Sequence, residues 1–410
     1  MSPENAFVIV GGGLAAGKAA EALREHGHRG PLVIIGDERE RPYMRPPLSK
    51  GYLLGKEERD SIFVHPEDWY AEHDVELLLG TSAASVDVRA REVELDGGRR
   101  VPYAKLLLAT GSSPRRLAVP GAELDNVLYL RRVGDSERLK AAFTEGARIV
   151  VIGGGWIGLE TAAAARTAGA EVTVLEHSEL PLLKVLGREA AEVFAGLHKD
   201  HGVDLRPRAE VESITGTDGR VDGVRLADGS RLDADAVVVG IGITPNVRLA
   251  QEAGLEVRDG IVTDEHLRTS VADIYAAGDV ANAYHPRLGR HLRVEHWANA
   301  LNQPLTAALS MLGQDAVYER LPYFYTDQYD LGMEYTGYAE PGGYDRVVFR
   351  GDVAGREFIA FWMARNRVLA GMSVNVWDVI DPIRALIQAG AGIDAARLSD
   401  PGVPLDSLVP

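Results

Sequence analysis

The 410-residue chain contains no cysteine. This absence excludes a structural disulfide, a cysteine-ligated metal cluster and a thiolate nucleophile. It also excludes a redox-active pair of the CxxxxC type. Any electron transfer by this chain must therefore proceed without a protein thiol.

Long hydrophobic runs are also missing. No stretch approaches the roughly 18 to 20 consecutive apolar residues of a membrane-spanning helix, so we expect no membrane partner. The first apolar strand begins near Ala6 and leaves no room for a signal peptide. The cytoplasm is therefore the expected location.

The chain has few basic residues relative to acidic ones, with 44 Lys and Arg against 60 Asp and Glu, and its formal net charge is -16. A phosphate backbone favours local and usually net positive charge, so we expect no nucleic-acid partner. A hydrophobic fraction of 46% is typical of a globular protein. Because a single core stops growing below this chain length, two or three domains are expected.

A glycine-rich turn between an apolar strand and a helix is present twice. The first copy, Gly11–Ala16, follows the apolar run 6–10, and the second, Gly153–Gly158, follows the run 149–152. A GxGxxG turn in this context lets the backbone approach a pyrophosphate at a helix N-terminus. Ala16 departs from the third glycine, but alanine is accepted where that position packs the helix on the strand. Two dinucleotides, a flavin and a nicotinamide, are expected.

Each copy continues to a second strand that ends in acidic residues, Asp37 and Glu38 in the first and Glu176 in the second. A carboxylate at this place accepts hydrogen bonds from ribose hydroxyls and repels a 2'-phosphate. NADH is therefore expected in preference to NADPH. His177 and Lys184 could soften this preference if they reach the same pocket.

Two short apolar runs, 105–111 and 236–242, each end in glycine. Residues 112–114, after the first run, look like a crossing into an inserted domain, and the second run, before 244–246, looks like the return crossing. Beyond residue 321 the chain becomes aromatic and alternating, which predicts a small antiparallel sheet followed by helices. The expected domains are a discontinuous FAD-binding domain (1–113 and 243–320), an inserted NAD-binding domain (114–242) and a C-terminal domain (321–410).

The stretch Thr269–Asp279 combines an apolar strand with a terminal Gly278-Asp279 pair. Here the chain resembles the two-dinucleotide flavoprotein reductases of glutathione-reductase fold. The resemblance implies that Asp279 accepts a ribityl hydroxyl and that Gly278 leaves room for the pyrophosphate. It implies an α/β fold with two Rossmann-like FAD/NAD-binding domains of glutathione-reductase type and a small α+β C-terminal domain.

The run Arg45–Lys50, RPPLSK, lies where the disulfide reductases carry their cysteine pair. It resembles the NADH-dependent ferredoxin and rubredoxin reductases of oxygenases and cytochromes P450, together with apoptosis-inducing-factor-like proteins. The resemblance covers essentially the whole chain. It implies that Lys50 lies near flavin N5 and Arg45 near the flavin phosphates or ring. It further implies that Glu160 approaches the nicotinamide carboxamide and pairs with Lys50, so these two residues are the expected catalytic pair.

Two further elements follow from the same resemblance. The helix that opens at Val294–Asn299 would point its N-terminus at flavin N1 and the C2 carbonyl, where a helix end stabilises negative charge. The run Tyr325–Gln328 stands where the family has an aromatic patch ending in Ser-Asp-Gln, often with tryptophan before the serine. Tyr325 is either a neighbour of the flavin ring or an ordinary sheet-packing residue.

The residues expected to bind a cofactor share these motifs or the strands beside them. They are Gly11, Gly13, Leu14, Ala15, Ala16, Asp37, Glu38, Arg45, Lys50, Ala83, Ala109, Thr110, Gly111, Arg131, Gly153, Gly155, Trp156, Ile157, Gly158, Glu160, Glu176, Gly242, Gly278, Asp279, Glu295, His296, Trp297, Ala298 and Tyr325. No histidine spacing suggests a metal site. The arginines at 287, 290, 293, 365 and 367 form either a solvated face or a dock for an acidic ferredoxin.

The implied function is that of a flavoprotein reductase with FAD and NAD as cofactors. NADH would pass a hydride to the flavin, and electrons would leave singly to a small iron-sulfur protein, a ferredoxin, that supplies an oxygenase or cytochrome P450. One alternative is an NADH oxidase or quinone reductase. Another is a redox-sensing interaction protein like the apoptosis-inducing factors.

Overall fold

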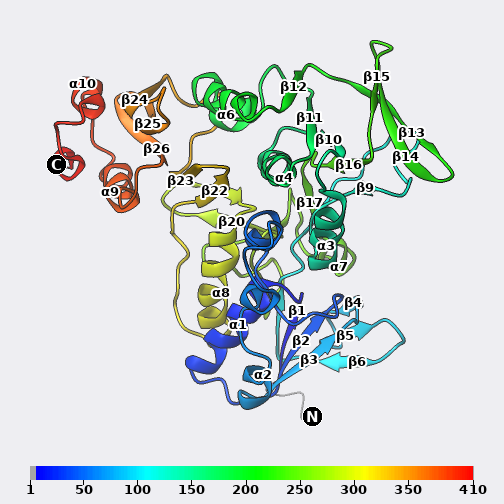
Figure 1. Cartoon of the computed structure of the whole chain (residues 1–410). Coiled ribbons are helices and arrows are strands. Elements are labelled where there is room, and N and C mark those ends of the chain that lie inside the picture. The colour runs from blue at the N-terminus through cyan, green and yellow to red at the C-terminus, as the bar shows by residue number, and fades with distance from the viewer. Residues whose placement is uncertain (1–5, 410) are drawn as a thin grey trace. The chain divides into compact units, whose positions relative to one another are not determined.

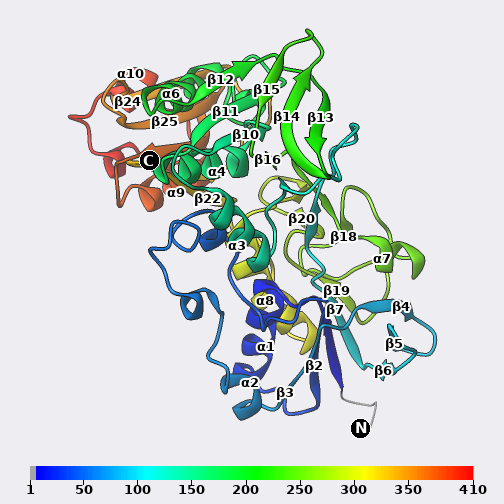
Figure 2. The same cartoon turned by 45° about the vertical axis from the view of Figure 1, so that its right-hand side comes forward.

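The computed structural model describes residues 6–409 and divides into two compact units. Figures 1 and 2 show the elements of both. Unit 1 contains the chain up to Pro46 together with Glu58–Ser113 and Ile243–Pro322, and unit 2 contains Pro47–Glu57, Pro114–Gly242 and Tyr323 onward. The short segment 47–57 groups with unit 2, although its flanks belong to unit 1. The expected division into three domains stays a prediction.

Unit 1 is built on a five-stranded parallel sheet. Its strands, in spatial order, are β19 (Ile274–Ala276), β7 (Lys105–Leu108), β1 (Phe7–Val10), β2 (Leu32–Gly36) and β3 (Val75–Leu79). Three of these strands, β19, β1 and β2, read as continuous apolar runs because helices or small sheets cover both of their faces. Since β1 has β2 on one side and β7 on the other, its carboxyl end is the point where strand order reverses and ligands bind in such sheets.

Alternate residues of these strands enter two separate cores. Phe7 and Ile9 pack with α1 (Leu14–Glu25) and α8 (Trp297–Met311), whereas Val8 and Val10 face the opposite side. Helices α1 and α8 lie side by side in both views (Figure 1). The glycine turn after β1 is therefore fixed between a buried strand and a buried helix.

Smaller elements complete unit 1. They are the antiparallel sheet β4 (Ala83–Asp87), β5 (Glu92–Leu95) and β6 (Arg100–Pro102), the sheet β18 (Ile261–Thr263), β20 (Ala281–His285) and β21 (Arg290–Arg293), and the helices η3 (Arg59–Ile62), α2 (Trp69–Glu72) and α7 (Arg248–Glu252). The strands β4, β5 and β6 lie beside one another in Figure 2. The linking strands β8 (Ser112–Pro114) and β17 (Ile243–Pro245) pair with each other.

Unit 2 repeats the parallel plan. Its first sheet consists of β12 (Asp204–Pro207), β11 (Glu171–Glu176), β10 (Arg148–Ile152), β16 (Ala236–Val239) and β9 (Val127–Leu128). The remaining elements of this part are η2 (Pro46–Ser49, which begins one residue before the unit 2 segment), α3 (Val133–Ala142), α4 (Trp156–Thr167), α5 (Leu183–Leu186), α6 (Arg188–Asp200), β13 (Val211–Thr217), β14 (Arg220–Leu226) and β15 (Arg231–Asp233). Helix α4 starts at Trp156, directly after the glycine turn.

The predicted antiparallel sheet beyond residue 321 is confirmed. It has five strands in the order β22 (Tyr323–Gln328), β23 (Leu331–Gly337), β26 (Arg367–Val374), β25 (Glu357–Ala364) and β24 (Arg346–Asp352), followed by α9 (Ile380–Ala389), α10 (Ala395–Ser399) and η4 (Leu405–Leu408). One face of this sheet shares a single apolar core with α4 and α6, through residues such as Phe194, Tyr335 and Trp362. This shared core places β22 against the start of α4 within unit 2.

Candidate functional site

The first glycine turn can be formed only by glycine at its first position. Gly11 has φ +128°, and a Cβ there would lie 2.1 Å from the carbonyl oxygen of Ala109. Gly13 precedes α1, and no side chain caps the helix there. Leu14, Ala15 and Ala16 form the buried first turn. The N-terminal amides of α1 are thus presented beside the carboxyl end of β1, as a pyrophosphate site requires.

A charged pair lies next to this turn. Arg45 donates to Glu38 Oε1 at 2.9 Å, and Tyr43 donates to Glu38 Oε2 at 2.5 Å. The Arg45 Nη2 atom is 3.9 Å from the place where a Cβ on Gly13 would lie. Although burial acts against its charge, Tyr43 and Glu38 raise the pKa of Arg45 above its ordinary value. Arg45 and Glu38 therefore meet at the turn, whereas Asp37 is exposed.

The Gly278-Asp279 pair reaches the same place from β19. Gly278 has φ +81°, and a Cβ on it would lie 3.3 Å from the Cβ of Ala15. Its amide donates to Oε1 of Gln303 at 2.8 Å, and Gln303 is buried on α8. Gln303 fixes the backbone of this turn, and its role was missed from the sequence because no local motif marks it.

The start of α8 is the fourth element of unit 1 that was expected to face a flavin. His296 precedes the helix without a side-chain cap, and burial lowers its pKa to about 4, so it is neutral near pH 7. Burial raises the pKa of Glu295, which is ion-paired with Arg293. Trp297 and Ala298 form the half-buried first turn. His296, Trp297 and Ala298 are thus uncharged near pH 7, and the helix dipole favours an anion at this N-terminus.

Three other predicted positions lie elsewhere in unit 1. Thr110 exchanges hydrogen bonds with Asn246, at 2.7 Å and 2.8 Å, and Gly111 follows with φ +64°. These bonds tie the end of β7 to the returning strand β17. Ala83 begins β4 and belongs to the core on the face opposite α1 and α8.

The second glycine turn has the same constraints. A Cβ on Gly153, where φ is +106°, would lie 2.4 Å from the Gly240 carbonyl oxygen, and one on Gly158 would lie 1.9 Å from the Gly153 carbonyl oxygen. Gly155 precedes α4 without a side-chain cap, and Ile157 is 42% exposed. The N-terminus of α4 is thus available to a second pyrophosphate.

Glu176 closes this turn at the end of β11. Its Oε2 accepts from the Gly154 amide at 2.7 Å and its Oε1 accepts from the Ser178 amide at 2.6 Å. The carboxylate therefore has a fixed place beside the glycines, where it can meet a ribose. Trp156 instead packs against Phe194 and Phe324, so its ring supports the sheet behind α4.

Lys50 and Glu160 are brought together within unit 2. Lys50 Nζ lies 2.6 Å from Glu160 Oε1, and Thr326 Oγ1 lies 2.6 Å from the same oxygen. Ser49 donates to Oε2 of Glu160. Glu160 is 4% exposed, so three donors offset the cost of burying its charge. The roles of Ser49 and Thr326 were not evident from the sequence, although both residues are adjacent to predicted site residues.

Segment 47–57 is held by further contacts with α3. Ser136 donates to the Leu48 carbonyl at 2.8 Å, and Tyr52 donates to Glu137 at 2.9 Å. The Tyr325 ring centroid lies 5.3 Å from Lys50 Nζ, and burial raises the pKa of Tyr325 to about 12. Tyr325 is therefore a neutral neighbour of the Lys50 ammonium rather than a remote packing residue.

The last two predicted positions occupy turns of unit 2. The Arg131 amide donates to Asp135 Oδ2 at 3.0 Å at the start of α3. The Gly242 carbonyl accepts from the Arg115 amide at 2.9 Å, and Gly242 has φ +99°. Neither contact joins these residues to the Lys50 and Glu160 cluster.

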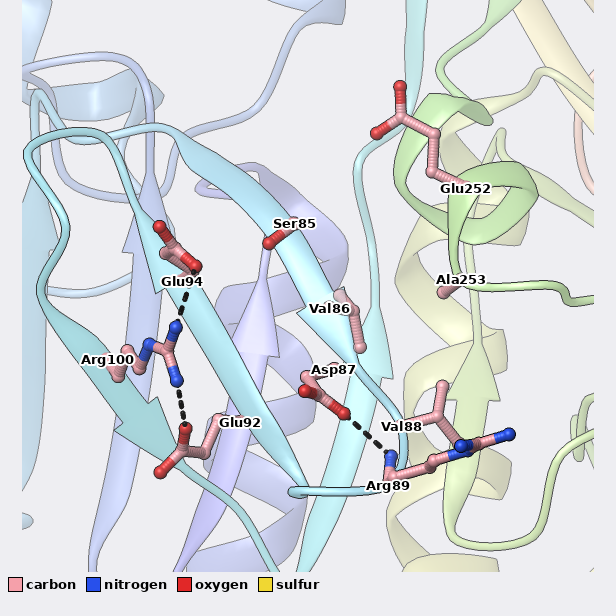
Figure 3. Close-up of a pocket in the computed structure, with 10 residues that line it drawn as sticks. All are labelled: Ser85, Val86, Asp87, Val88, Arg89, Glu92, Glu94, Arg100, Glu252 and Ala253. Atoms are coloured by element: carbon pink, nitrogen blue, oxygen red, sulfur yellow. Dashed lines mark hydrogen bonds and ion pairs between the residues drawn. The ribbon is translucent and has the colours of Figure 1, made fainter.

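An open cavity of about 380 Å³ lies on unit 1 between the β4–β6 sheet and α7 (Figure 3). Arg100 pairs with Glu92 and Glu94 there, and Asp87 accepts from the Arg89 amide. None of the predicted site residues lines it. The candidate sites are therefore the first glycine turn, within unit 1, and the second glycine turn and the Lys50 cluster, each within unit 2, not this cavity.

Part of the expected arginine face is neutralised. Arg287 pairs with Glu319 at 3.5 Å, and Arg293 pairs with Asp259 at 3.0 Å. Across residues 6–409, no three or more histidine and acidic side chains are placed to hold a metal ion. Over the same residues, every helix is too short or too polar to cross a bilayer.

Comparison with known proteins identifies the family of this chain. Residues 5–303 match the family described as pyridine nucleotide-disulphide oxidoreductase, and residues 323–409 match the reductase C-terminal family. The chain is 42% identical to the anthranilate 1,2-dioxygenase system ferredoxin--NAD(+) reductase component of Burkholderia cepacia, over 98% of this chain and 99% of that protein.

Two solved structures resemble it closely. The covalent putidaredoxin reductase-putidaredoxin complex matches with a TM-score of 0.95 and 36% identity, over 99% of this chain and 98% of that one. The ferredoxin reductase for the CYP199A2 system of Rhodopseudomonas palustris matches with a TM-score of 0.94 and 35% identity, over 99% and 100% of the two chains. The chain therefore belongs to the pyridine nucleotide-disulphide oxidoreductase family, with the ferredoxin--NAD(+) reductases of oxygenase and cytochrome P450 systems among its relatives.

Proposed function

We propose that this chain oxidises NADH and passes the electrons through FAD to a ferredoxin that serves an oxygenase or a cytochrome P450. The observation that carries the proposal is the pair of glycine turns, each with an uncapped helix N-terminus, in a chain with no cysteine. Two dinucleotides can be held, and electrons cannot leave through a protein thiol.

The residues of unit 1 fit FAD. Gly11, Gly13 and Gly278 have no side chain, and a Cβ at any of them would contact neighbouring atoms, so the backbone stays accessible to a ligand. Arg45 supplies positive charge beside this backbone. We assign the pyrophosphate to α1, the ribose to Glu38 and the ribityl chain to Asp279. Bound FAD would supply acceptance of a hydride and release of single electrons.

The residues of unit 2 fit NADH. Gly153 and Gly155 would hold its pyrophosphate at α4, and Glu176 would accept its ribose hydroxyls and repel a 2'-phosphate. Lys50 and Glu160 would bind and orient the reacting groups, because hydride transfer depends on alignment rather than on an acid or base. Tyr325 would exclude water beside the Lys50 ammonium. We also propose a cytoplasmic location, since NADH is formed and consumed there.

The test is an anaerobic titration of the FAD-loaded protein with NADH, followed by mixing with a [2Fe-2S] ferredoxin. We expect prompt flavin bleaching, then reoxidation that is matched by ferredoxin reduction. Control mixings with oxygen and with a quinone should be slower. A reduced protein that oxygen or quinone discharges and ferredoxin does not would favour an oxidase or quinone reductase, and a stable reduced complex would favour a redox sensor.

A further inference from the structure

A line of buried polar side chains leads away from Glu160 within unit 2. Gln328 Nε2 lies 3.1 Å from Thr326 Oγ1, which in turn lies 2.6 Å from Glu160 Oε1. On its other side, Gln328 Oε1 lies 2.8 Å from His198 Nε2, and the Tyr329 hydroxyl lies 3.4 Å from His198 Nδ1. Glu160, Thr326, Gln328 and His198 are each at most 4% exposed. The line thus joins α4, β22 and α6 through polar atoms in an otherwise apolar core.

The chemistry of these groups fixes the direction of every hydrogen bond. An ionised carboxylate only accepts, so the Thr326 hydroxyl gives its single hydrogen to Glu160 and accepts from the Gln328 amide nitrogen. The Gln328 carbonyl oxygen also only accepts, so His198 must carry its hydrogen on Nε2. The free Nδ1 of His198 then accepts from the Tyr329 hydroxyl. Each donor therefore points toward Glu160, and bonds aligned in this way strengthen one another.

The titratable groups near the two ends are few. Lys50, Tyr325 and Asp327 act on the Glu160 end, and burial raises the pKa of Asp327. His201 and Asp330 act on the other end. The His201 ring stacks on Tyr329 at 3.8 Å and lies 3.7 Å from the Asp330 carboxylate, and the Arg166 guanidinium donates to the His201 carbonyl oxygen. Burial lowers the pKa of His198 to about 4, which keeps its ring neutral at physiological pH. A neutral ring is what the one-way line requires.

We propose that Thr326, Gln328 and His198 are positioning residues that hold the Glu160 carboxylate in alignment with Lys50 for the reaction with NADH. The proposal rests on the proposed function for its link to NADH. His198 then influences the position of the Glu160 carboxylate, although three hydrogen bonds separate the two side chains. Loss of any link removes or weakens a donor to the carboxylate, and fewer donors raise the pKa of a carboxyl group.

The first experiment tests the line of hydrogen bonds through the tautomer of His198, without measuring activity. Long-range ¹H–¹⁵N correlation spectra of the FAD-loaded, ¹⁵N-histidine-labelled protein would report the tautomer of His198, which is assigned by its loss in His198→Gln. We expect a neutral ring with hydrogen on Nε2 from pH 8 down to about pH 5. Thr326→Val should shift these ring signals, although it does not alter His198 itself. An Nδ1–H tautomer, or a charged ring at pH 7, would overturn the proposal.

The second experiment compares Thr326→Val, Thr326→Ser and the control Thr336→Val, which alters an equally buried hydroxyl of β23 outside the line. The rate of flavin reduction by NADH is measured against pH. We expect Thr326→Val to slow it about tenfold at pH 7, as loss of one charge-assisted hydrogen bond predicts. The acid limb should also move to higher pH. Thr326→Ser should restore both values, and Thr336→Val should change neither.

Gln328→Met provides a second break in the line if Thr326→Val fails to fold, with the same expected direction. A normal pH profile in a folded variant of either kind would overturn the proposal. These readouts concern the histidine tautomer and the NADH half-reaction. A failure to reduce ferredoxin would therefore contradict the proposed function without deciding the role of the line.

Discussion

Lys50 and Glu160 stand 110 residues apart in the sequence, and their side chains form an ion pair at 2.6 Å with exposures of 13% and 3%. Replacing Lys50 by methionine would leave the Glu160 carboxylate with only the Ser49 and Thr326 hydroxyls. We expect the free energy of unfolding to fall by about 2–4 kcal/mol, because an uncompensated buried charge is costly. Urea unfolding would measure this change.

The matched control is Lys56→Met, which alters an exposed lysine of the same segment and should cost less than about 0.5 kcal/mol. In a Glu160→Gln background, Lys50→Met should cost much less than in the wild type, because the charge that Lys50 offsets is gone. Equal costs in both backgrounds would show that the pair is not coupled.

Gly153→Ala should abolish or strongly weaken NADH binding. The new Cβ would lie 2.4 Å from the Gly240 carbonyl oxygen at a backbone φ of +106°, so the turn must shift. Thermal unfolding and NADH binding would both report the change. Gly196→Ala is the control on α6, where a Cβ meets open space. It should leave NADH binding unchanged and stabilise the helix by up to about 1 kcal/mol.

Glu176→Ala should raise kcat/KM with NADPH by about tenfold or more and lower it with NADH, because a carboxylate that repels the 2'-phosphate is removed. Steady-state kinetics with both coenzymes would measure the ratio. Glu179→Ala removes a nearby carboxylate that pairs with Arg188 and Arg208 at the surface. An equal change in the ratio for Glu179→Ala would indicate a general charge effect instead.

Gln303→Leu should reduce FAD retention. The Gly278 amide would lose its acceptor in a buried turn, and an unsatisfied buried amide costs about 1–3 kcal/mol. The flavin content of the purified protein and the FAD dissociation constant would show the loss. Asn302→Leu alters the preceding residue of α8, which is only partly buried, and should leave FAD bound. Full retention of FAD by Gln303→Leu would contradict the assigned role.

His198 should make the folded protein sensitive to acid. Its pKa is about 4 in the fold against an ordinary 6.5, so between these values the unfolded chain binds a proton that the folded chain does not. The free energy of unfolding therefore falls as pH is lowered through this window, by up to about 3 kcal/mol. His198→Gln removes this contribution. The stability difference between variant and wild type should change between pH 7 and pH 4, and a constant difference would contradict the assignment.

Much of the fold could be predicted because its determinants are local. The strands before Gly11 and Gly153 are buried on both faces, so they read as continuous apolar runs, and glycine is required where each run ends. The alternating aromatic residues around Phe358 likewise predicted the antiparallel sheet. The grouping of 47–57 with unit 2 could not be predicted, because it depends on contacts of Leu48 and Tyr52 with a helix far along the chain.

The residues of the candidate sites also include some that could be predicted from the sequence and some that could not. The glycine turns and Glu176 were found because strand, turn and acid follow one another at fixed spacing. Ser49, Gln303 and His198 were not assigned roles, since their partners lie 111, 25 and 130 residues away. A hydrogen bond between distant positions leaves no periodic pattern in a single sequence.

The division of each unit into three separate segments has a consequence for synthesis on the ribosome. Unit 1 lacks β19 of its sheet and all of α8 until the chain has been made to Met311, which is more than three quarters of the 410 residues. Unit 2 waits still longer, because β22 and the strands that complete its core lie after Pro322. Neither unit can finish folding while the chain is half made. A chain that stopped at Gly242 would lack one segment of unit 1 and one segment of unit 2, so neither unit would have its complete core.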